Sequence, residues 1–300
     1  MTTPDRRPTV IGLGELLWDV FPDGRRPGGA PANFAFQTEQ LGCHGVLATR
    51  VGADVDGDEL LQALREKSLD LSIVQRDPER KTGWVSVTLR DGHPEYVIHE
   101  NVAWDAIEFT PALQSMMQQA AAVCFGTLAQ RSGPSRTAIH AAVSATPAEC
   151  LRVYDVNLRQ SYYAEEWVSA SLRLATIVKL NDEEVPVVAR LLGIADEPLE
   201  FSRLLITRFD LQIVCITRGA KGCLVVTQTE HHDVPGKAIK VADTVGAGDA
   251  FTAGFVFAQL QEWPVGLSAE FANRVGAMVA SRQGAMPELR REFAQLIEQY

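Results

Sequence analysis

Residues 243–249 read DTVGAGD, and an apolar helix pattern follows them at once. Small residues at the start of a helix leave backbone N–H groups bare, and the helix dipole adds positive character there, so this segment is predicted to form an anion pocket. The carboxylate of Asp249 stands at the edge of that pocket. An anion-binding group beside a proton acceptor suggests transfer of a phosphoryl group to a hydroxyl.

The composition narrows the class of protein. The chain has 300 residues, of which 46% are hydrophobic, and this is enough to build one large domain. A net charge of −10 without a Lys/Arg run argues against nucleic acid and anionic membranes as partners. No stretch approaches the roughly 18 apolar residues that a membrane span needs. Five scattered cysteines, with no C-x-x-C pair, indicate reduced core thiols of a cytoplasmic protein rather than disulfides or a metal site.

Short apolar runs alternate with helix patterns along most of the chain. The runs that predict buried strands lie at 10–13, 46–51, 122–125, 151–155, 177–180 and 213–217. Helices are expected at 31–41, 56–66, 111–119, 135–145, 164–175, 182–192, 250–261, 268–282 and 287–298. This alternation predicts an α/β fold in which a mainly parallel central sheet is covered by helices on both faces.

One region breaks the alternation. Apolar and polar residues alternate from 85 to 90, a DG turn signal follows, and residues 96–98 are apolar again, so a hairpin is expected. The stretch WDVF at 18–21 also reads as a short strand outside the main series. An ordinary edge hairpin is one interpretation. The other is a single domain over 1–300 with a small β-sheet lid, formed from about 15–27 and 84–100, that covers a site.

Two segments of the chain resemble the signatures of the ribokinase-like (PfkB) carbohydrate kinases. Residues 243–249 match the C-terminal signature DTxGAGD, and GGAPAN at 28–33 resembles the N-terminal one. More general phosphate motifs fail, because the third glycine of the dinucleotide fingerprint would fall at Leu17 and no P-loop occurs. The resemblance implies a ribokinase-like three-layer sandwich that binds ATP and Mg²⁺ and phosphorylates a sugar.

Within that family, three segments look most like bacterial fructokinases: GELLWD at 14–19, GGAPAN at 28–33 and AWD at 103–105. The implied reaction is transfer of the γ-phosphate of ATP to a primary hydroxyl of a ketohexose, with fructose favoured. Two alternatives stay open. The acceptor could instead be 2-keto-3-deoxygluconate, ribose or a nucleoside, or the chain could be a sugar-binding relative without turnover. Because relatives often pair their lids, a homodimer through the lid is also open.

The resemblance assigns roles to individual residues. Asp249 would be the base, and the amides of Gly246, Ala247 and Gly248 would contact the transferred phosphate. The residues expected to bind the sugar are Asp19, Gly29, Asn33, Trp104 and Arg159. Those expected near the nucleotide and its Mg²⁺ are Asn181, Glu184, Thr217, Arg218, Gly219 and Asn273. Some relatives also bind a monovalent cation such as K⁺, largely through main-chain carbonyls, and the matching positions are Asp243, Val245, Val279, Arg282 and Gly284.

Plainer interpretations of the same residues remain open from the sequence alone. Asp249 could merely cap the amides of its helix. Asp19 could be a turn former, and Asn33 a cap or an exposed helix residue. Glu184 could cap a helix N-terminus, and Arg159 could be a surface side chain paired with Asp155.

Overall fold

The main sheet of the protein has eight strands. The computed structural model describes residues 7–90 and 93–300, and the strand order of this sheet is β14-β13-β12-β11-β10-β9-β1-β4. Six neighbouring strands are parallel: β4 (His44–Ala48), β1 (Thr9–Leu13), β9 (Ala122–Gly126), β10 (Leu151–Asp155), β11 (Ile177–Asn181) and β12 (Ile213–Thr217). The strands β13 (Cys223–Thr227) and β14 (His231–Val234) extend the sheet in antiparallel pairing.

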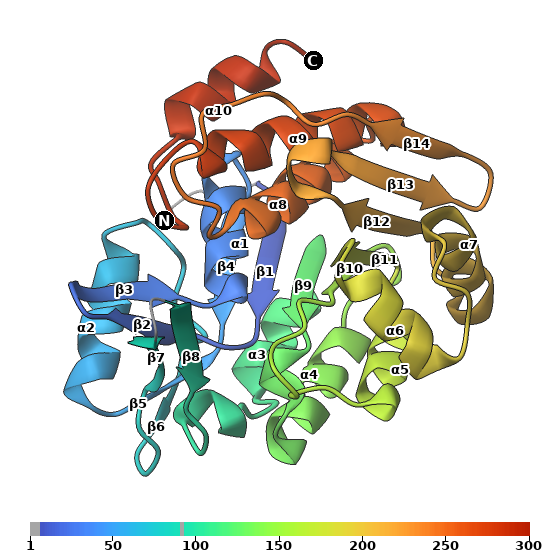
Figure 1. Ribbon diagram of the computed structural model, residues 1–300. Helices are drawn as coiled ribbons and strands as arrows, with labels where there is room; N and C mark the ends of the chain where they lie inside the picture. Colours follow the sequence, from blue (N-terminus) through green and yellow to red (C-terminus); the bar gives the residue numbers. More distant parts are fainter. Residues whose placement is uncertain (1–6, 91–92) are drawn as a thin grey trace.

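Helices cover both faces of this sheet, as Figure 1 shows. One apolar core joins the sheet to α1 (Ala30–Gln40), α8 (Ala247–Leu260), α9 (Val265–Ala280) and α10 (Arg290–Ile297). The other joins it to α3 (Pro111–Met117), α4 (Gly133–Ser144), α5 (Glu165–Leu174), α6 (Glu184–Leu192) and α7 (Pro198–Phe209). Successive strand residues alternate between the two cores, so the parallel strands are largely apolar. The predicted three-layer α/β fold is confirmed.

Two of the differences from the sequence prediction have a clear physical reason. The helix α7 was not predicted, because its cap is Glu197, whose carboxylate accepts from the amides of Leu199 and Glu200, rather than one of the common capping residues. The predicted strand at 46–51 is two strands. The second, β5 (Arg50–Gly52), leaves the main sheet and pairs with β6 (Gln75–Asp77). An apolar run reveals burial but not the pairing partner.

A separate sheet of four strands, here called the small sheet, has the order β3-β2-β7-β8. It is built from β2 (Leu17–Phe21), β3 (Gly24–Gly28), β7 (Gly83–Arg90) and β8 (His93–Ile98). The strand β2 pairs antiparallel with β3 and parallel with β7, so the two predicted lid segments lie side by side. The expected DG turn lies outside the described residues. That the small sheet acts as a lid stays a prediction.

One buried arginine ties the chain leaving the small sheet to the main domain. Arg131 donates from Nε and Nη2 to the two carboxylate oxygens of Asp105, at 2.8 and 2.9 Å. Its Nη2 also donates to the carbonyl of His99, just after β8, and its guanidinium lies 3.9 Å from the ring centroid of Trp104. The Arg131 and Asp105 side chains are 4% and 9% exposed, so each charge depends on the other.

Replacing Asp105 tests this link. Asp105→Ala leaves the Arg131 charge buried without its partner and should lower the free energy of unfolding by about 3–5 kcal/mol. The matched control is Asp23→Ala, which breaks an exposed ion pair with Arg26 and should change the same quantity by less than about 1 kcal/mol. Urea unfolding of both variants measures the difference. Equal effects of the two substitutions would contradict the assigned role of Arg131.

Candidate active site

The first turn of α8 presents a glycine-rich N-terminus. Gly246 is the cap residue with φ 77°, a left-handed conformation that favours glycine, and a Cβ added there would come within 2.7 Å of Ala285. The Ala247 amide donates to the Thr244 carbonyl. The amides of Gly248 and Asp249 have no partner among the described residues. Bare amides at a helix N-terminus are suited to bind an anion.

The two signature segments meet at this helix start. Asn33, in the first turn of α1, donates from Nδ2 to Oδ2 of Asp249 over 2.7 Å, although 216 positions separate them in the chain. The Asn33 side chain is buried, and its Oδ1 has no hydrogen-bond partner. The residue predicted as the base and a residue predicted to bind sugar therefore lie in direct contact.

Asp19 lies beside the same region. A Cβ added at Gly28 would come within 2.2 Å of Asp19 Oδ2, so the carboxylate packs directly against that backbone. A Cβ at Gly29, where φ is 116°, would come within 2.5 Å of the Glu15 carbonyl. Burial raises the pKa of Asp19 to about 6, and the positive charge of Arg159 opposes this shift. The glycine pair thus lets the main chain pack closely against the Asp19 carboxylate on one side and the Glu15 main chain on the other.

Arg159 faces this region rather than Asp155. The positive charge of this exposed residue lowers the pKa values of Glu15, Asp19 and Asp249, so it lies close enough to act on all three. Asp155 instead pairs with Lys179, so the interpretation of Arg159 as the partner of Asp155 is wrong. We use the name Asp249 cluster for Glu15, Asp19, Asn33, Arg159 and Asp249.

The environment of Asp249 prepares it to accept a proton near neutral pH. Burial is the main cause that raises the pKa of Asp249 to about 6, and the negative charge of Asp155 adds to this shift. The hydrogen bond from Asn33 and the positive charges of Lys179 and Arg159 act in the opposite direction. A general base works best when its pKa lies near the working pH.

Sequence reasoning missed Glu15. Its side chain is buried, and its Oε2 has no hydrogen-bond partner. Burial raises the pKa of Glu15 to about 7, Arg159 lowers it, and the negative charge of Asp249 raises it further. The available signal was an acidic residue inside the otherwise apolar stretch 10–18, since such a residue is rarely buried without a role.

Asn181 and Glu184 form a helix cap at the start of α6. The Asn181 amide donates to Glu184 Oε2 at 2.8 Å, and the Glu184 amide donates to Asn181 Oδ1 at 2.9 Å. The second carboxylate oxygen of Glu184 accepts from the Leu158 amide. Both oxygens are thus engaged by main chain, which is the geometry of the plainer interpretation, and the role of these residues toward Mg²⁺ stays a prediction.

The residues expected at the nucleotide gather along the antiparallel edge of the main sheet. Thr217 ends β12, and Gly219 opens the 3₁₀ turn that follows. Arg218 pairs with Asp233 of β14 through two bonds, at 2.5 and 3.1 Å. Asn273 of α9 donates to the carbonyl of Val234 in the same strand, at 3.4 Å. The fold therefore places Arg218 and Asn273 against β14, and Thr217 and Gly219 at the end of β12.

Trp104 packs beside Arg131 and Gly83. Its side chain is 1% exposed and packs under Arg131, and the described residues offer no hydrogen bond to its Nε1. Its predicted contact with the sugar stays a prediction.

The residues matched to the cation site lie near one another. The Asp243 carboxylate accepts from the amides of Val245 and Gly284, both at 3.0 Å, and the Arg282 amide donates to the Val279 carbonyl at 2.9 Å.

Within residues 7–90 and 93–300, no group of three His, Cys, Asp or Glu residues could hold a metal ion. In the same part of the chain, no helix is long and apolar enough to cross a membrane.

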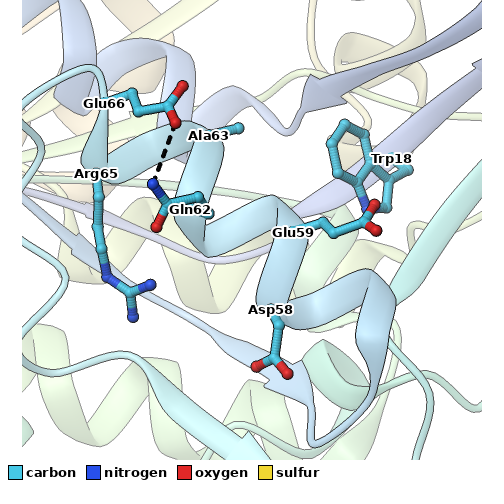
Figure 2. Close-up of a pocket in the computed structure, with 7 residues that line it drawn as sticks. All are labelled: Trp18, Asp58, Glu59, Gln62, Ala63, Arg65 and Glu66. Atoms are coloured by element: carbon cyan, nitrogen blue, oxygen red, sulfur yellow. Dashed lines mark hydrogen bonds between the residues drawn. The ribbon is translucent and has the colours of Figure 1, made fainter.

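A surface hollow of about 640 Å³ lies elsewhere, between β2 and α2 (Val55–Arg65). Figure 2 shows Trp18 beside α2, with the Glu59 side chain extending toward it and that of Asp58 pointing away. No member of the Asp249 cluster lines this hollow.

The chain resembles known carbohydrate kinases over most of its length. A family model described as pfkB family carbohydrate kinase matches residues 13–291. Fructokinase-1 of Zea mays is 30% identical over 322 residues, which cover 97% of this chain and 98% of that protein. Two solved structures are each 27% identical with a TM-score of 0.80. One is a Vibrio cholerae O395 fructokinase with fructose, ADP and calcium ion bound, with 97% of this chain and 99% of that chain covered. The other is an uncharacterized sugar kinase from Pyrococcus horikoshii in complex with ATP, with 96% and 99% covered. These neighbours have the ribokinase-like fold, which confirms the fold expected from the resemblance.

Neutralising Glu15 should stabilise the protein at high pH. Because burial raises its pKa from 4.5 to about 7, the stability that goes with the neutral form is complete below pH 4.5 and is lost as the pH rises through 7. Glu15→Gln should therefore raise the free energy of unfolding by about 1–3 kcal/mol at pH 8, and by much less at pH 5.

Urea unfolding of the Glu15 variant and the wild type between pH 5 and 8 measures this difference. The control is Glu298→Gln at an exposed position of the C-terminal segment, for which no such pH-dependent gap is expected. A gap that is absent at pH 8, or that widens toward pH 5, would show that Glu15 is not held in its neutral form.

Proposed function

The chain belongs to the pfkB family of carbohydrate kinases, and on that premise we propose that it transfers the γ-phosphate of ATP to a primary hydroxyl of a ketohexose, with fructose as the acceptor. The observation that carries the proposal is the 2.7 Å hydrogen bond between Asn33 and Asp249, which joins a group suited to bind hydroxyls to a group suited to deprotonate one. Fructokinase-1 of Zea mays and the fructose-bound Vibrio cholerae structure support the choice of acceptor.

In this proposal Asp249 removes the proton from the acceptor hydroxyl. With a pKa of about 6, its carboxylate is mostly ionised at neutral pH and still basic enough to take a proton in the transition state. The hydroxyl oxygen then attacks the γ-phosphorus in line with the leaving oxygen. Among the amides predicted to contact the transferred group, that of Ala247 instead donates to the Thr244 carbonyl. The amides of Gly246 and Gly248, together with that of Asp249, would face the negative charge that spreads over this group.

The sugar is placed between Asp19, Asn33 and Arg159. The Asp19 carboxylate accepts hydrogen bonds from hydroxyls, Asn33 can both accept and donate, and the Arg159 guanidinium donates. Gly29 leaves room for the sugar to approach the main chain. The small sheet would cover this site as a lid and exclude water, so that the phosphoryl group passes to the sugar rather than to water. Pairing of two such sheets would give a homodimer.

Bound ATP would supply the phosphoryl group, and a Mg²⁺ ion would offset the charge of its phosphates. The nucleotide would be held at the antiparallel edge of the main sheet by Thr217, Arg218, Gly219 and Asn273. Because main-chain amides engage both oxygens of Glu184, this residue and Asn181 would reach Mg²⁺ only through water. Carbonyls near Asp243 and Gly284 would hold K⁺.

The five cysteines are free and buried, which fits a reducing compartment, and we place the protein in the cytoplasm.

Removing the base tests the mechanism. Asp249→Asn keeps the shape and the contact with Asn33 but cannot accept the proton, so kcat for ADP release should fall by about 10²–10⁴-fold. The control is Asp58→Asn in the hollow of Figure 2, which should leave kcat unchanged. A folded Asp249 variant with nearly normal turnover would remove this residue from the mechanism.

A panel of acceptors tests the substrate. ADP release with fructose, 2-keto-3-deoxygluconate, ribose and a nucleoside should give the highest kcat/KM for fructose. Asp19→Ala should raise the KM for the preferred acceptor by about 10–100-fold, since a hydrogen bond to a charged group contributes about 1.5–3 kcal/mol. Asp23→Ala, an exposed position beside β2, serves as the control.

Another acceptor at the top of the panel would overturn the proposed substrate, and no ADP release with any acceptor would overturn the proposed activity. An unchanged KM in the Asp19 variant would remove Asp19 from the sugar site.

A further inference from the structure

A buried ion pair lies directly beneath the first turn of α8. Lys179 of β11 donates from Nζ to Asp155 Oδ1 at 3.1 Å, and the two side chains are 9% and 6% exposed. A Cβ added at Gly248 would come within 3.2 Å of Lys179 Nζ, so the ammonium group packs against the glycine-rich turn itself. Neither charged residue belongs to the signature segments.

A hydroxyl group connects this ion pair to the turn. Thr252 Oγ1 lies 3.1 Å from Asp155 Oδ2 and 3.0 Å from the Gly248 carbonyl, and Thr252 is buried. Its single proton is shared between the two acceptors. The strands β10 and β11 are thereby linked through one side chain to the residue that precedes Asp249.

Stability alone does not explain this arrangement. A buried ion pair costs desolvation on both partners, and well-packed apolar residues of similar volume often replace such a pair at no loss of stability. The neighbouring positions of both strands are apolar and buried, so the surroundings would accept that replacement. The presence of this ion pair therefore needs another explanation. The turn that carries Asp249 packs directly against the ammonium group of Lys179.

The charges around Asp249 come from several elements. Asp155 raises the pKa of Asp249, and Lys179 and Arg159 lower it. Glu15 interacts with Asp249 from the turn after β1, and Glu184 of α6 with Lys179. Cys124 of β9 lies near both carboxylates, and burial keeps its pKa well above the usual range, so the thiol stays neutral. The described groups that face this site are Glu15, Cys124, Asp155, Arg159, Lys179 and Glu184.

We propose that Asp155, Lys179 and Thr252 are positioning residues of the kinase reaction: the ion pair holds the first turn of α8 in place through Thr252 and balances the charge around Asp249. This inference rests on the proposed function. None of the three side chains needs to touch sugar or nucleotide, because each acts through Gly248 or Asp249. Asp155 raises the pKa of Asp249 and Lys179 lowers it. A role in balancing charge therefore predicts opposite effects of removing the two residues, whereas a purely structural role does not.

The test compares two charge-removing variants. Asp155→Asn should move the acidic limb of the pH profile of kcat/KM to lower pH, and Lys179→Met should move it to higher pH, each by about 0.5–1 pH unit. The double variant should return the limb close to its wild-type position. Limbs that stay in place, or that shift in the same direction in both single variants, would overturn the proposal.

Thr252→Val provides a test that preserves volume and charge. Loss of the hydroxyl should lower kcat by about 3–10-fold at unchanged KM for the sugar, and Thr252→Ser should restore it, because misplacement of a reacting group lowers the rate without loss of binding. The control is Thr207→Val on the exposed face of α7. An unchanged kcat in Thr252→Val would show that the link does not position the turn. This variant and Asp155→Asn decide the question if Lys179→Met does not fold.

A second readout separates this inference from the proposed function. The titration of the Asp249 carboxyl, followed by ¹³C NMR in the free protein, should shift in the same opposite directions without any substrate. If the wild-type protein released no ADP with any acceptor, the proposed function would fail, and the titration would still show whether the pair balances the charge at Asp249. No shift of this titration in either variant would overturn the inference, whatever the activity.

Discussion

The hydrogen bond from Asn33 to Asp249 is the contact on which the site depends. It fixes the start of α1 against the start of α8, and both helices pack on the same face of the main sheet. Since each residue lies in the first turn of its helix, their positions follow from how the two helices dock. The large apolar core beneath them, which includes Phe251 and Phe255, is therefore a requirement of the site as well as of stability.

Several ionisable groups are buried together at this site, and their desolvation lowers the stability of the folded protein. Glu15 and Asp249 are both shifted toward their neutral forms by burial, and Lys179 retains its charge only because carboxylates surround it. A protein selected for stability alone would replace such groups by apolar ones. Their presence at the carboxyl end of parallel strands, where α/β proteins bind ligands, is the pattern expected of a site that trades stability for chemistry.

Much of the fold could be predicted from the sequence because parallel strands buried on both faces are mostly apolar. The ion-pair partner of Asp155 could not be predicted in this way. Residues 155–159 read DVNLR, which places Arg159 near Asp155 in the chain. In the structure, Asp155 instead pairs with Lys179 from the neighbouring strand. Likewise Glu197 gives a weak start signal for α7. Local patterns describe burial and turns, whereas partners across strands depend on how the chain packs.

The cysteines give the fold a further property. All five are buried, and burial holds the pKa values of Cys43 and Cys223 near 12, so these sulfur atoms remain protonated thiols. Only thiolates react readily with peroxides or disulfides, and each of these cysteines is at most 5% exposed in the folded state. Resistance to mild oxidants thus arises here from packing alone, and alkylation of a cysteine by a soluble reagent would report that the domain has opened.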